Sequence, residues 1–395
     1  MSSEHVNRNP NNEHEGFASA KAMAELANRE ISNESPEIPV VPGTSELEAA
    51  IESELVQRKL AERHPDWPPV LLEIYYSPHG SARDAPCLAD RISQSDIYLP
   101  EGASGPENTG LYQAVADADH AEYPPEYLER EALDTITYGD APVRGQFIET
   151  MVRGLYDSHT IVGHIDMDPE KNAIDAEIES KKSEAWATPI NRHGSFREAL
   201  DSIWTQVAEV AAQERRREGL MLDRFEPEIE RILHEHSELK ALPELHVLAS
   251  LGSFHTQFSH RAERAGIPMK RSYAEKPYVY PYYMELMRSA AFEIVPTKEL
   301  MAKAYFERIF DDEVAGKLMP DAPRTRSNVE FDRYSRAVAS AFSLEEIEAF
   351  HERHRADSDY GELVDMVREK GFGEIPRTAD GLHETVARLH RGGIL

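Results

Sequence analysis

Four residues that can bind metals or transfer protons follow short apolar runs at widely separated points of the chain. They are His79, Glu101, Asp166 and His255, and each run has the length and composition of a strand. Parallel strands of one sheet bring their carboxyl ends to a common edge. Two imidazoles and one or two carboxylates there suit a divalent transition metal with open positions. The pattern predicts a metal site of His79, Glu101 and His255 that holds zinc, manganese, cobalt or iron.

Each of these residues also has an ordinary explanation. A lone His, Glu or Asp after a strand is more often a helix cap, a turn former or a solvent contact than a ligand. The two histidines lie too far apart in sequence for a local metal motif, so the prediction depends on the fold. It also assumes that the strand ending at Glu101 neighbours the strand that leads to His79.

The clearest of the apolar runs extends from Leu245 to Leu251, between Pro243 and Gly252. Its length and boundaries predict a buried strand. After His255 the apolar residues recur at helical spacing, and Gly266 is placed to end that helix. His255 is therefore expected at a strand-to-helix junction, where a glycine lets the backbone turn tightly.

Further elements follow from the same signals. Apolar runs predict strands from Pro69, from Asp96 and from Thr160, and the intervening spacing predicts helices. The Ser195-Phe-Arg-Glu198 capping box opens a long helix, which Pro227 is expected to interrupt. Predicted helix starts at Thr297 and Ser343 open the C-terminal region. The fold class is therefore α/β, with a mixed, largely parallel central sheet, flanking helices and a helical C-terminal layer.

Three parts of the chain are distinguished by composition. Residues 1–45 are rich in Asn, Glu, Ser and Pro and are expected to be disordered. Residues 46–275 should form the α/β domain. Residues 276–395 should form helices packed on it, as a lid or as a dimerisation layer of a homo-oligomer. Near the start of this last part, Tyr278 and Tyr280 belong to an aromatic cluster that either lines a substrate groove or packs the junction with the sheet.

Composition excludes several classes of partner. The net charge of −29 argues against nucleic acid and anionic membrane surfaces, because both require a cationic footprint. No apolar run reaches the roughly 20 residues of a membrane helix, and no secretory signal is recognised, so a cytoplasmic location is expected. The single cysteine, Cys87, is expected to be a small buried hydrophobe. The histidine pairs His234/His236 and His351/His354 lie in polar helical stretches and are expected at the surface.

The arrangement of these motifs resembles the TraB/PrgY/TIKI family, which is related more distantly to the erythromycin esterases and to ChaN. The resemblance lies in a late strand with Gly-x-x-His, here Gly252 to His255, followed by a helix closed by glycine. It also lies in the early histidine His79, in Glu101 after the second strand, and in the segment Arg217-Glu218-Gly-Leu-Met221. Tyr76 stands where the early motif of the family has glycine. The resemblance extends over about residues 70–273.

The resemblance implies a sheet of the same kind as in the erythromycin esterases and ChaN, and a site made from His79, Glu101, Arg217 and His255. It implies a metal-dependent hydrolase of an amide or ester bond, with a small-molecule or peptide substrate, in which Arg217 stabilises the oxyanion. The alternative is a non-catalytic regulatory or ligand-binding protein on the same fold, which Tyr76 favours. A haem carrier is disfavoured, because that role accompanies export.

Overall fold

The computed structural model describes residues 60–77, 84–101, 112, 115–116, 152–156, 158–169, 171–252, 255–273, 280–315, 328–355 and 361–392. All of them belong to the unit Thr44–Leu395. The predicted N-terminal tail, His79 and Tyr278 lie outside the described residues, and the predictions made for them stay predictions.

The described strands form one five-stranded parallel sheet in the order β3-β2-β4-β1-β5. They are β1 (Val70–Ser77), β2 (Ile97–Pro100), β3 (Ile161–Val162), β4 (Leu245–Gly252) and β5 (Met269–Tyr273). The prediction of an α/β fold is confirmed. The expectation that the strand of Glu101 neighbours the strand leading to His79 is wrong, because β4 pairs with both β1 and β2 and separates them. Strands consecutive in the chain are adjacent in only about two-thirds of cases.

Both faces of the sheet are buried, as in other parallel sheets. On one face Ile74, Leu99 and Ala249 pack in a hydrophobic cluster with the C-terminal half of helix α9 and with α10 (Thr256–Arg264). On the other face Tyr75 and Tyr98 pack in a second cluster, which includes residues of α4 (Asp84–Ile92) and of the helical stretch 152–156. The alternation of side chains along each strand produces this division.

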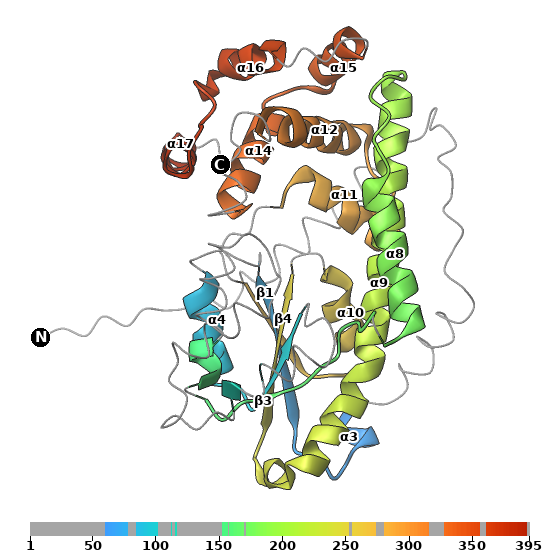
Figure 1. The fold of residues 1–395 in the computed structure, drawn as a ribbon, viewed down its shortest axis with the longest axis vertical. Helices are drawn as coiled ribbons and strands as arrows, with labels where there is room; N and C mark the ends of the chain where they lie inside the picture. The colour runs from blue at the N-terminus through green and yellow to red at the C-terminus, as the bar shows by residue number, and fades with distance from the viewer. Residues whose placement is uncertain are drawn as a thin grey trace, which may run out of the picture. The chain divides into compact units, whose positions relative to one another are not determined.

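Helix α9 (Phe196–Glu235) is 40 residues long, its C-terminal half lies beside the sheet, and α8 (Ala173–Ala187) packs along it (Figure 1). The predicted capping box at its start is present, since Ser195 and Glu198 each accept from the other's backbone N–H. The prediction that Pro227 interrupts the helix is wrong. Proline removes one helical N–H bond, and the fully buried side chains of Phe225 and Ile229 on either side hold the turn against the core.

The N-terminal half of α9 belongs to a separate hydrophobic cluster, which the C-terminal helices build. These helices are α11 (Tyr282–Ala291), α12 (Lys298–Ile309), α14 (Asn328–Ser340), α15 (Leu344–His354), α16 (Gly361–Val367) and α17 (Ala379–Arg391). The predicted N-caps Thr297 and Ser343 both accept a hydrogen bond from their own helix. One helix thus contributes to two cores, with Ala211 in the first and Met221 in the second.

Two predictions of burial are wrong. His351 is 2% exposed: its Nε2 lies 3.0 Å from the carbonyl oxygen of Gly194 and its Nδ1 2.8 Å from the hydroxyl of Tyr305. Both ring nitrogens have partners, so the imidazole is buried at little cost. Cys87, expected in the core, is exposed on α4.

Three carboxyl groups, those of Glu307, Asp311 and Asp332, interact in the helical layer. Burial, reinforced by the charge of Asp311, raises the pKa of Asp332 to about 8 from an ordinary value of 3.8. Burial likewise raises the pKa of Asp311 to about 7, although it accepts a hydrogen bond from Ser335. Ionisation of this cluster therefore opposes folding as the pH rises.

We expect Asp332→Asn to stabilise the protein in a pH-dependent manner. Because the folded pKa lies above the unfolded one, the cost of ionising Asp332 is absent below about pH 4 and grows toward pH 8. Thermal melts from pH 4 to 9 should show the gain in melting temperature increasing over that interval. Asp90→Asn, on the exposed face of α4, should show no such trend. A gain that is equal at all pH values would contradict the assignment.

Candidate active site

Glu101 follows β2 at the carboxyl edge of the sheet. Its backbone N–H donates to the Ser250 carbonyl at 3.0 Å, which continues the β2–β4 pairing by one residue. Its carboxylate accepts a hydrogen bond from the backbone N–H of Gly252 and lies 2.8 Å from Nε2 of His255. The end of β4 thus holds Glu101 through both backbone and side chain.

His255 lies between two carboxylates at the start of α10. The side chain is 1% exposed, with Nε2 facing Glu101 and Nδ1 3.5 Å from Oε1 of Glu218. Burial disfavours the charged imidazole, but attraction to Glu101 outweighs it and raises the pKa of His255 to about 10. The Tyr76 hydroxyl donates to the backbone carbonyl of His255 at 3.2 Å, and the Tyr76 ring stacks on Tyr273. Tyr76 therefore supports this junction.

Arg217 and Asp166 form a buried bidentate ion pair beside Glu101. Nε of Arg217 lies 2.8 Å from Oδ1 and Nη2 2.5 Å from Oδ2 of Asp166. Burial alone would raise the pKa of Asp166, but the charge and hydrogen bonds of Arg217 outweigh it and lower that pKa to about 2. Nη2 also lies 3.4 Å from Oε1 of Glu101, and Nη1 3.5 Å from Oε2 of Glu214. The guanidinium thus links three carboxylates.

Glu214 and Glu218 are site residues that the sequence did not identify as such. They lie three residues before and one residue after Arg217 on α9, and both are buried, at 7% and 2% exposure. Glu214 also pairs with Lys182 of α8 at 3.0 Å. The sequence feature that could have identified them is the spacing of residues 214, 217 and 218, which places their side chains on one face of a helix. Carboxylates on a helix are usually solvated, so the spacing alone did not indicate a site.

The structure brings together three of the predicted site residues: Glu101, Arg217 and His255. His79 lies outside the described residues, so the predicted distance between the two imidazoles stays a prediction. Within the described ranges, no group of three or more His, Cys, Asp and Glu side chains is arranged to hold a metal ion. Tyr280 lies under the guanidinium of Arg288, whose Cζ is 4.5 Å from the ring centroid. Its predicted role in a substrate groove, with Tyr278, also stays a prediction.

Comparison with protein-family models, with curated proteins and with solved structures found no match to this chain. Among the helices that the structure describes, none combines the length and apolar character needed to cross a membrane.

Proposed function

We propose that the chain is a hydrolase of amide or ester bonds, of the TraB/PrgY/TIKI type, whose active site is the carboxyl edge of the sheet. The observation that carries the proposal is the buried pair of Glu101 and His255, 2.8 Å apart and 13% and 1% exposed. Burial of an acid and a base beside each other is common at catalytic sites, which require perturbed proton affinities. The carboxyl edge of a parallel sheet is also where ligands bind in such folds.

The proposed divalent ion would be held by His79, Glu101 and His255, of which the structure describes Glu101 and His255. Oε1 of Glu101 and Nε2 of His255 lie 2.8 Å apart, which is a hydrogen-bond distance. Two ligands of a tetrahedral ion with bonds of about 2.0–2.2 Å would lie roughly 3.3–3.6 Å apart, so the two side chains would separate slightly on binding the ion. Such an ion supplies a water molecule of lowered pKa when it is bound. Around it, Glu218 would orient His255 through Nδ1, as carboxylates commonly orient histidine ligands.

The proposed role of Arg217 as an oxyanion donor requires one of its present contacts to change. Nε and Nη2 bind Asp166 at hydrogen-bond distance, whereas Nη1 reaches Glu214 only at 3.5 Å. Nη1 is therefore the donor that a developing oxyanion could take over. The other donors keep the guanidinium in place and limit its reorganisation during the reaction.

A second candidate is a non-catalytic ligand-binding or regulatory protein. Two observations favour it: Tyr76 stands where the family motif has glycine and donates a hydrogen bond to the backbone carbonyl of His255, and the imidazole lies between two carboxylates. In this candidate the network of Glu101, His255 and Arg217 has only a structural role.

Metal analysis decides between the two candidates. After incubation with zinc, manganese, cobalt or iron(II) and desalting, wild type should retain about one ion per chain and hydrolyse model esters or amides. His255→Ala should lose both, because it removes one nitrogen ligand. His246→Ala is the matched control, since that histidine lies on β4, the strand that leads to His255, with half its side chain exposed, and should change neither. Wild-type protein without ion retention or hydrolysis would favour the second candidate.

A further inference from the structure

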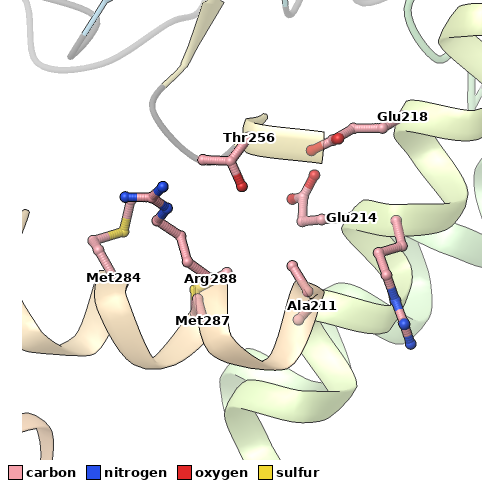
Figure 2. A pocket seen from close by; sticks show the side chains of 9 residues that line it. Ala211, Glu214, Glu218, Thr256, Met284, Met287 and Arg288 are labelled. Atoms are coloured by element: carbon pink, nitrogen blue, oxygen red, sulfur yellow. The ribbon is translucent and has the colours of Figure 1, made fainter. Parts of the chain in front are cut away.

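A cavity opens between α9, the start of α10 and α11, next to the proposed active site (Figure 2). Its polar lining includes Glu214, Glu218 and Thr256, and its apolar lining includes the thioethers Met284 and Met287. The volume in which the centre of a water-sized group can lie is about 10 Å³, so the cavity has room for one such group. The cavity thus admits the tip of a ligand and not a whole drug-sized molecule.

Three polar oxygen atoms in this lining have no hydrogen-bond partner among the residues that the structure describes. They are Oε2 of Glu214, Oε2 of Glu218 and the hydroxyl oxygen of Thr256. Among the described residues, Oε2 of Glu214 has an ion-pair contact with Nη1 of Arg217 at 3.5 Å. In Figure 2 the two carboxylates lie toward each other, with the hydroxyl of Thr256 on the same side of the cavity. Buried acceptors without donors are costly, so a ligand that supplies donors would be stabilised.

The geometry points to a binding site for a primary ammonium group of the substrate, seated between Glu214, Glu218 and Thr256. An ammonium group has three N–H donors and no acceptor, which matches three acceptors without donors. Two carboxylates supply the opposite charge. The carbon chain that carries the nitrogen would extend toward Met284 and Met287, whose flexible side chains adapt to apolar groups.

The same lining restricts the rest of the ligand. The guanidinium of Arg288 lies at the side of the cavity away from the two carboxylates, and its Nε has no hydrogen-bond partner among the described residues (Figure 2). A second cation on that side would be repelled, so the remainder of the ligand is neutral or anionic. Amino-acid derivatives and peptides with a free amino group have this character. As a statement about the substrate, the inference rests on the proposed hydrolase function.

The test measures binding without turnover, so it can fail or succeed independently of hydrolysis. The probe is n-pentylamine, and 1-pentanol is the uncharged molecule of the same length. Calorimetry or ligand-observed NMR should show that wild type binds the amine roughly 10-fold or more tightly than the alcohol. Binding of the amine by a protein that hydrolyses nothing would support this site while the hydrolase proposal fails.

Substitutions locate the binding. Glu214→Gln and Glu218→Gln should each weaken amine binding roughly 10-fold or more, since each removes a charged acceptor. Thr256→Val, which keeps the side-chain volume and leaves both carboxylates in place, should weaken it roughly 2- to 10-fold. Glu209→Gln, at an exposed position of the same helix, should leave it unchanged.

Three results would overturn the inference: no binding of the amine to wild type, equal binding of amine and alcohol, or amine binding that survives all three cavity substitutions. Equal binding of the amine and the alcohol would mean that the cavity is apolar or filled with water and does not recognise an ammonium group. If a glutamine variant does not fold, as judged by circular dichroism, amine binding that is unchanged in Thr256→Val overturns the inference on its own, because that substitution changes no charge.

Discussion

Arg217→Met is expected to cost about 3–5 kcal/mol of unfolding free energy at neutral pH, because it leaves Asp166 buried without its cation. Asp166 is 2% exposed and receives two hydrogen bonds from the guanidinium. Urea denaturation monitored by circular dichroism measures the change. Arg216→Met is the matched control: the neighbouring guanidinium is partly exposed and pairs with Glu177 at 3.5 Å, so its loss should cost less than about 1 kcal/mol.

The pH dependence of this loss identifies its cause. The pKa of Asp166 is lowered from 3.8 to about 2, so the ion pair stabilises the fold fully above about pH 4. That stabilisation is lost as the pH falls toward 2. The difference between wild type and Arg217→Met should therefore shrink over the same interval. A loss that stays constant from pH 7 to 3 would assign the effect to packing of the arginine stem and not to its charge.

Glu101→Gln is expected to reduce hydrolysis by roughly 10²- to 10⁴-fold, the usual contribution of a group that transfers protons. It should also destabilise the fold by about 1–3 kcal/mol. The carboxylate faces three donors, on Gly252, His255 and Arg217, and a glutamine amide turns one of its two ends into a donor. Activity is measured at a temperature where both proteins are folded, so that the two effects are separated. Glu230→Gln, exposed on α9, should change neither quantity.

The imidazole reports whether Glu101 acts through charge. Because the pKa of His255 is raised to about 10 from 6.5, its interaction with Glu101 stabilises the fold fully below about pH 6.5 and loses that effect as the pH rises toward 10. The stability difference between wild type and Glu101→Gln should decrease over that range. An NMR titration should show the pKa of His255 lowered in the variant. An unchanged pKa would contradict the electrostatic role of Glu101.

Four of the five described strands were predictable from sequence, because each lies in a short apolar run with clear boundaries. Strand β5 (Met269–Tyr273) was not predicted, because its residues are mostly polar. Leu245 to Leu251 lies between Pro243 and Gly252, and β4 occupies Leu245–Gly252. The order of the strands was not predictable, because periodicity within a segment does not specify its partner. The position of β4 between β1 and β2 depends on contacts distant in sequence. Pro227 was misleading for a similar reason: its local cost is offset by burial of Phe225 and Ile229, which only the folded structure shows.

The candidate site was predictable where a polar residue ends a strand, as for Glu101 and His255. The topology of an α/β fold brings such residues to one edge whatever their separation in sequence. Glu214 and Glu218 could not be recognised, because their neighbours on α9 are also charged and the sequence does not show which helix face is buried. His351 was misassigned to the surface for the same reason, since its partners Gly194 and Tyr305 come from distant segments.

The central position of β4 has a consequence for synthesis on the ribosome. Both described neighbours of β1 are later strands, since Val70 pairs with Leu245 of β4 and Leu72 with Met269 of β5. A nascent chain that ends before Leu245 has no described strand with which β1 can pair, and its apolar edges stay open. Late pairing of this kind slows folding and favours association between incomplete chains. We therefore expect fragments truncated before β4 to aggregate, whereas chains that extend beyond β5 can close the sheet.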